Sequence, residues 1–208
     1  MSTVPRAHDW NVENDDGTSP FVMWAGVASA VGGACWVIKG VAILVTGDQP
    51  PFLFEIAPLF LLIGLMGLRA LLGHRGGRMA TVGVAALGLA ALMGIATWLL
   101  SVTADDSRPA GSEEEFQPTL LVAFLALLTG LVLLGLVTRR TRALGDRWSN
   151  LPLGLVAGAP IIAIVGGALE AINERLLEIP LVLYGCGWMG LGYALIRSVS
   201  RNPDHLRL

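Results

Sequence analysis

The sequence predicts an all-α membrane protein with six transmembrane helices, and its composition is the first reason. The 208 residues are 54% hydrophobic and only 14% charged, whereas soluble domains contain about 25% charged residues. Several windows contain about 20 apolar residues, which is enough to cross a hydrocarbon core about 30 Å thick. The mean hydropathy of +0.66 indicates the same class of protein.

Polar connections separate the first three hydrophobic segments. The first helix is expected at 21–46, after an acidic start, and it ends at the polar connection 46–51. The second helix is expected at 52–72 and ends beside arginines. The third is expected at 79–103 and ends at the connection 104–117, whose five carboxylates predict a solvated outer loop.

The last three helices are also predicted from apolar stretches between polar connections, and two of them contain a proline beyond their first residue. An uncharged apolar stretch predicts the fourth helix at 118–138, directly before a pair of arginines. The fifth helix is expected at 151–175, where the interior Pro160 should kink the helix or free a backbone carbonyl. The sixth is expected at 178–197, where Pro180 falls in the first turn and is well tolerated.

The arginines predict the orientation of these helices, because cytoplasmic connections carry an excess of basic residues. One side of the predicted bundle has only Arg108 and Arg175. The other side carries Arg69, Arg75, Arg78, Arg139, Arg140, Arg142, Arg147, Arg197, Arg201 and Arg207. Both termini are therefore expected in the cytoplasm, in a multi-pass protein of the cell (inner) membrane.

Three regions are expected along the chain. Residues 1–20 read as a disordered, acidic cytoplasmic tail. Residues 21–197 form the six-helix transmembrane domain, and residues 198–208 form a second cytoplasmic tail.

The first and last hairpins also resemble each other, which indicates a partial repeat. Val31-Gly32-Gly33-Ala34 recurs as Val165-Gly166-Gly167-Ala168. The corresponding helices run in the same direction, so this would be a parallel repeat.

Charge and motif content argue against several classes of function. The net charge of −2 gives no support for a nucleic-acid partner. His8, His74 and His205 all fall in tails or connections, so we expect no metal site or haem in the membrane, and no cofactor. Residues 185–190 match the pattern GxGxxG, but inside a predicted span the pattern indicates a close-packing surface and not a dinucleotide loop.

Lys39 is the most informative residue, because it is the only lysine and it lies inside the first hydrophobic segment. A charged side chain at membrane depth costs roughly 2.5–3.5 kcal/mol on insertion and is usually kept for a function. Helical spacing places it on one stripe with the small residues Gly32 and Cys35. Small residues allow helices to approach closely, so Lys39 is expected to face protein.

We expect a substrate-binding site around Lys39 in the outer half of the membrane. Glu170 is its first expected partner, because Lys39 lies about 10 Å and Glu170 roughly 8 Å below the outer ends of their helices. Glu55, which begins the second helix, is the competing partner. Glu174 and Glu178 continue the same carboxylate-lined vestibule, and Trp36 lies deeper in the first helix.

Three functions are compatible with this site. The leading hypothesis is small-solute transport or ligand capture. The alternative is a non-catalytic accessory or scaffold subunit, in which the lysine pair only fixes helix register and the other carboxylates simply face water. A third reading is an intramembrane enzyme acting on a lipid or isoprenoid, with Glu55 or Glu170 as general acid. A nearby lysine would lower the pKa of that carboxyl, which argues against the enzyme.

These hypotheses leave the catalytic residues unassigned and favour a protein that is not an enzyme. The expected partners are the lipid bilayer, a small-molecule ligand, and either a membrane-protein partner or a second copy of the chain.

Overall fold

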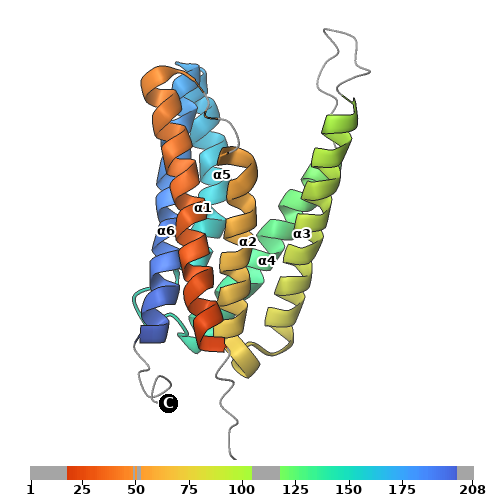
Figure 1. The fold of residues 1–208 in the computed structure, drawn as a ribbon, viewed down its shortest axis with the longest axis vertical. Helices are drawn as coiled ribbons and strands as arrows, with labels where there is room; N and C mark the ends of the chain where they lie inside the picture. The colour runs from red at the N-terminus through yellow and green to blue at the C-terminus, as the bar shows by residue number, and fades with distance from the viewer. Residues whose placement is uncertain (1–17, 49, 51–52, 105–117, 201–208) are drawn as a thin grey trace, which may run out of the picture.

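The computed structural model describes residues 18–48, 50, 53–104 and 118–200, and the secondary structure of this part of the chain is helical, with short turns between the helices (Figure 1). The predicted tail 1–20 therefore lies mostly outside the described residues, as does the acidic part of the connection 104–117. The described α-helices are α1 (Thr18–Thr46), α2 (Leu53–Leu72), α3 (Gly77–Ala104), α4 (Pro118–Thr141), α5 (Leu151–Glu170) and α6 (Glu178–Ser200). The described residues also form the short 3-10 helices η1 (Gly73–Gly76) and η3 (Glu174–Leu177).

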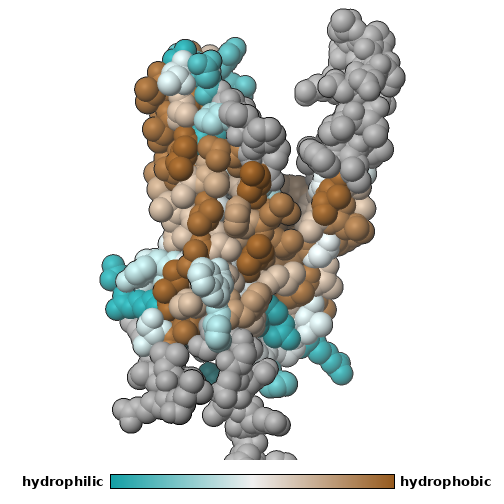
Figure 2. Space-filling model, in the orientation of Figure 1, coloured by the Kyte–Doolittle hydropathy of each residue, from teal (hydrophilic) through white to brown (hydrophobic). Residues whose placement is uncertain are grey.

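Five stretches of the described helices are long and apolar enough to cross a membrane. The stretch Ile56–Ala96 runs through α2, η1 and α3, so it contains two of the α-helices. Figure 2 shows a broad apolar zone between polar groups at the two ends of the molecule. The structure thus confirms an all-helical chain with several membrane-length apolar helices, while six spans and cytoplasmic termini stay predictions.

The helix boundaries differ most from expectation at the fifth helix. It was expected to reach residue 175, but α5 ends at Glu170 and the chain turns through η3 before α6 begins. Asn173 supports this turn, because its side-chain Oδ1 accepts a hydrogen bond of 2.9 Å from the Arg175 backbone N–H. α5 itself is one continuous helix through Pro160.

Glycines bring α1 and α6 into close, antiparallel contact. A Cβ on Gly26 would lie 2.8 Å from the Gly192 carbonyl oxygen, and a Cβ on Gly33 would lie 2.5 Å from that of Gly185. We call Gly26, Gly33 and Gly40 of α1, with Gly185 and Gly192 of α6, the glycine ladder. Its members recur every seven residues on each helix, the spacing expected for two helices that wrap around each other.

The opposite face of α1 packs on α2, which makes α1 the central helix of this part of the fold (Figure 1). A Cβ on Gly64 of α2 would lie 2.6 Å from Ser29 Cβ, and a Cβ on Gly32 would lie 2.8 Å from a Leu61 methyl group. Ser29 is fully buried, and its hydroxyl donates a 3.0 Å hydrogen bond to the backbone carbonyl of Trp188 in α6. Ser29 therefore joins the central helix to α6 while it packs on α2.

The helices α3 and α4 form a second pair, which diverges from the other helices toward the end of the molecule where α6 begins (Figure 1). Leu87 of α3 and Leu131 of α4 are fully buried where the two helices meet. A Cβ on Gly135 of α4 would lie 2.8 Å from a Leu153 methyl carbon, so α4 also contacts α5. The hydrophobic core of the described residues joins both groups of helices and includes Leu65, Leu68, Leu72, Leu134, Leu144, Leu191 and Leu195.

Large apolar side chains are exposed on the outer faces of several helices. They include Ile63, Leu92, Ile95, Leu125, Ile164 and Leu183. Water would disfavour so continuous an apolar surface, whereas hydrocarbon would not. The helices are thus compatible with a multi-pass membrane protein.

The two halves of the predicted repeat have different surroundings. Gly32 and Gly33 are both buried, one against α2 and the other against α6. Gly166 is buried against Leu177, but Gly167 is exposed and has open space where a side chain would lie. Since the matched glycines do not make matched contacts, duplication of the hairpin stays a prediction.

Candidate functional site

Lys39 of α1 and Glu178 of α6 form a buried ion pair. Lys39 Nζ lies 3.5 Å from Glu178 Oε1, and the two side chains are 10% and 8% exposed. Glu178 is the first residue of α6, where the helix dipole favours a negative charge. Lys39 lies about two turns before the end of α1 at Thr46, so the pair is about 10 Å below that helix end.

Gly40 makes room for the carboxylate of this pair. A Cβ on Gly40 would lie 3.4 Å from Glu178 Oε2 and only 2.6 Å from a Val182 methyl carbon. Glu178 stands seven residues before Gly185, so it occupies the last position of the glycine ladder on α6. The tight packing of α1 on α6 therefore holds the ion pair between the two helices.

One carboxylate oxygen of the pair lacks a hydrogen-bond partner. Glu178 Oε2 is buried and accepts no hydrogen bond from any described residue. Leaving such an oxygen unsatisfied costs roughly 1–3 kcal/mol, and more when it carries charge. A hydrogen-bond donor placed at this oxygen would therefore be strongly favoured.

The predicted pair of Lys39 with Glu170 is wrong, because among the described residues it is the carboxylate of Glu178 that pairs with Lys39. Glu170 is the last residue of α5, and it is exposed. The depth argument assumed that α5 lies beside α1. Among the described residues, α6 and α2 pack along α1, whereas α5 packs on α4, α6 and η3.

The other predicted site residues lie at different distances from the pair. Glu55 falls in the first turn of α2, but its side chain is outside the described part of the structure. Glu174 is exposed at the start of η3. Trp36 is half-buried and precedes Lys39 by one helical turn.

Trp36 belongs to a cluster of aromatic rings between α1 and α6. It stacks on Tyr184 with ring centroids 5.5 Å apart and an interplanar angle of 22°. Tyr184 in turn meets Trp188 edge-on, at a centroid distance of 6.1 Å. We call these three residues the aromatic trio. The indole Nε1 atoms of Trp36 and Trp188 are buried and donate to no described residue.

Sequence reasoning missed Glu178 as the partner and Tyr184 as a neighbour of Trp36. The signal that could have found both is the seven-residue spacing of Glu178, Gly185 and Gly192, which matches Gly40, Gly33 and Gly26 in reverse order. Aligning these two series predicts which helix faces Lys39. The GxGxxG segment, in contrast, does form a packing surface: Gly185 contacts α1, and Gly187 faces Leu155 of α5.

The end of the α1–α6 pair near Lys39 carries one further cation. Arg175 of η3 packs its guanidinium over Gly47, where a Cβ would lie 2.5 Å from Arg175 Nη2. Gly47 adopts a positive φ of 85° directly after the end of α1. The C-terminal end of a helix attracts positive charge, so Arg175 is well placed there and joins η3 to α1.

The chemistry available at this site is that of one buried acid–base pair beside aromatic rings. It can bind a proton, a cation or a hydrogen-bond donor at the unsatisfied oxygen of Glu178. Comparison of the chain with models of protein families, with curated proteins and with solved structures found no match. The function must therefore be argued from the chain's own residues.

Proposed function

We propose that this chain is a six-span protein of the cell membrane that binds, and in that way transports or captures, a small solute carrying an N–H donor. The buried Lys39–Glu178 pair, with its unsatisfied carboxylate oxygen, is the observation that carries this proposal. Ionisable residues at membrane depth are expensive and usually mark a pathway or a binding site.

The proposed orientation rests on where the arginines lie. Arg69, Arg78, Arg140 and Arg197 fall at helix ends on the side of the molecule where α6 ends (Figure 1). By the excess of basic residues on cytoplasmic connections, this side faces the cytoplasm and the Lys39–Glu178 pair lies in the outer half.

The chemistry of the pair defines the solute that we propose. A donor on the solute would satisfy Glu178 Oε2 without requiring Lys39 to leave Oε1. The apolar faces of Trp36 and Tyr184 lie along the same two helices and would receive a cation or the carbon chain of an amine. A small primary amine meets both requirements.

A transport experiment tests this proposal. Proteoliposomes holding the full chain are pulsed with putrescine, a small amine with N–H donors, and the membrane current is recorded. Tetramethylammonium is the matched probe, because it is a cation without any N–H donor. We expect a current with putrescine that is several-fold larger than with tetramethylammonium. Equal currents with the two cations would contradict the proposed chemistry, and no current with putrescine would contradict transport.

The matched double variant for that experiment leaves the net charge of the site unchanged. Lys39→Met with Glu178→Gln removes both charges and leaves a pair of similar size. We expect this double variant to fold and to lose the putrescine current. If the double variant conducts as the wild type does, the pair is not the binding site.

The glycine ladder favours a second candidate, a scaffold subunit in which the pair only fixes the register of α1 on α6. The tight approach of Gly33 to Gly185 suits a rigid, non-moving pair of helices. This candidate predicts that the double variant loses the correct helix register and a co-purifying membrane partner, but that no solute changes its stability.

A further inference from the structure

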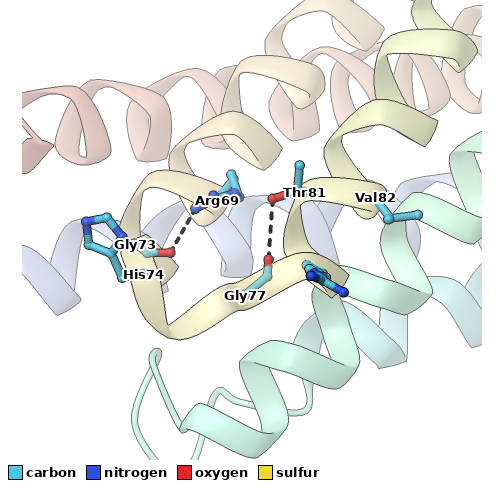
Figure 3. A pocket seen from close by; sticks show the side chains of 7 residues that line it. Arg69, Gly73, His74, Gly77, Thr81 and Val82 are labelled. Atoms are coloured by element: carbon cyan, nitrogen blue, oxygen red, sulfur yellow. Dashed lines mark hydrogen bonds between the residues drawn. The ribbon is translucent and has the colours of Figure 1, made fainter.

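The turn between α2 and α3 holds a basic hollow at the end of the molecule opposite the Lys39–Glu178 pair. The hollow has a volume of about 440 Å³ and is open to the surroundings. Arg69, Gly73, His74, Gly77, Arg78 and Thr81 line it, as Figure 3 shows from close by. Three basic side chains, from α2, η1 and α3, thus surround one small space.

Arg69 is fixed in this hollow by the backbone of the turn. Its Nη1 donates a 3.0 Å hydrogen bond to the Gly73 carbonyl oxygen, and Figure 3 shows the side chain on the wall that faces Thr81. Gly73 and Gly77 adopt positive φ values of 47° and 52°, and a Cβ at either position would meet open space. The two glycines reverse the chain and leave the turn accessible from outside.

The positive charge of the hollow has no carboxylate to balance it among the described residues. Arg142 pairs with Asp146 at 2.9 Å, but neither Arg69 nor Arg78 forms such a pair within the described part of the chain. The sequence contains no Asp or Glu from residue 56 to residue 104. Arg140 of α4 adds a further cation nearby, since its Nη1 lies 3.5 Å from the Met79 sulfur.

The first turn of α3 adds to this attraction for anions. α3 begins at Gly77, and its first turn contains no acidic residue. The first backbone N–H groups of a helix have no partner within it, and the helix dipole makes this end positive. Arginine forks and helix N-termini both bind phosphate oxygens well.

The wall of the hollow on the membrane side is apolar. Val82 lines it and is 56% exposed, and Leu89, two turns further along α3, is 45% exposed on the same face. We propose that this hollow binds the phosphate headgroup of an anionic phospholipid, with Arg69 and Arg78 on the phosphate and the acyl chains along Val82 and Leu89. Basic pockets between helices at the membrane surface are known to suit such headgroups.

Native mass spectrometry of the full chain in detergent tests this site. The protein is titrated with phosphatidylglycerol and, separately, with phosphatidylcholine that carries the same acyl chains. We expect tighter binding of phosphatidylglycerol. For Arg69→Gln with Arg78→Gln we expect an about 30-fold weaker affinity, taking about 1 kcal/mol for each arginine near an anionic headgroup.

Two further variants separate loss of the binding site from loss of overall positive charge and from disruption of the turn. Arg197→Gln removes one arginine from the same end of the molecule, in the last turn of α6 and outside the hollow. It should bind phosphatidylglycerol as the wild type does. Arg78→Gln alone leaves the hydrogen bond between Arg69 and Gly73 intact, so a loss of binding there cannot come from a disrupted turn.

Each outcome bears on the proposal. Equal losses in Arg78→Gln and Arg197→Gln would mean that only the overall positive charge attracts the lipid, and this would overturn the site. Unchanged binding in the double variant would overturn it as well. A last arm adds millimolar inorganic phosphate: displacement of the lipid would identify free phosphate as a ligand of the same arginines, whereas no displacement identifies the lipid headgroup.

Discussion

The two ends of this molecule place their basic side chains in different surroundings. At one end Lys39 is buried between two helices and pairs with Glu178 at 3.5 Å. At the other end Arg69 and Arg78 line an open hollow, and among the described residues neither has a carboxylate partner. The first arrangement uses glycines to bring helices together, and the second uses them to reverse the chain between helices.

This difference shows that burial decides what a charge can do. A buried, paired charge contributes to stability through its partner, and removing either member leaves an expensive charge behind. An exposed arginine contributes little to stability and is free to act on a ligand. Substitutions at the two ends should therefore separate stability from binding.

Removal of one member of the buried pair should have the largest effect. Lys39→Met leaves the Glu178 carboxylate buried without its cation, which should destabilise the protein by about 3–5 kcal/mol. The midpoint of thermal unfolding in detergent, followed by tryptophan fluorescence, measures this. Adding Glu178→Gln should restore most of the lost stability. A double variant as unstable as Lys39→Met would mean that the two residues are not coupled.

Substitution of a glycine in the glycine ladder should cause the second largest loss of stability. Gly33→Ala places a methyl group 2.5 Å from the Gly185 carbonyl oxygen, so α1 and α6 must move apart, at a cost of about 1–3 kcal/mol. Gly88→Ala is the matched control, because a Cβ at Gly88 would meet nothing within 4 Å. The control should be neutral or slightly stabilising, since alanine favours helix. Equal thermal stability of the two variants would argue against close α1–α6 packing.

A smaller effect is expected from the hydroxyl that joins α1 to α6. Ser29→Ala removes the 3.0 Å hydrogen bond to the Trp188 carbonyl, which should reduce stability by about 0.6 kcal/mol. Thr129→Val is its control, because Thr129 is exposed and its hydroxyl bonds only to its own helix, at Leu125. A chemical-unfolding curve for each variant in mixed micelles resolves the difference.

The smallest effect on stability should come from the basic hollow. Arg78→Gln changes an exposed side chain, so the free energy of unfolding should stay within about 0.5 kcal/mol of the wild type. Its affinity for phosphatidylglycerol should nevertheless fall. A large loss of stability in Arg78→Gln would contradict the view that the arginines of the hollow contribute to binding and not to stability.

Hydropathy predicted the helices because membrane length and apolar composition act locally along the chain. Composition could also predict that Lys39 needs a protein environment, since lipid offers it no partner. It could not predict which carboxylate lies beside Lys39. That choice depends on which helix packs on α1, and it is the seven-residue spacing shared by α1 and α6, not the apolar composition, that distinguishes α6 from α5.

The position at which α5 ends also could not be predicted from hydropathy. The apolar pattern runs past Glu170, so hydropathy alone extends the helix to residue 175. The turn through η3 depends on contacts made in three dimensions, such as Asn173 with the Arg175 backbone and Arg175 over Gly47. The basic hollow was predicted only as a set of arginines, because its shape comes from two positive-φ glycines.

The most direct test of the proposed outer site is a putrescine titration of the purified full chain by calorimetry, in the wild type, in Lys39→Met with Glu178→Gln, and in Arg78→Gln. Our account predicts that the wild type and Arg78→Gln bind putrescine with the same affinity, whereas the folded double variant binds it at least about tenfold more weakly, a change of about 1.4 kcal/mol. Equal affinities in all three proteins would contradict the assignment of solute binding to Lys39 and Glu178.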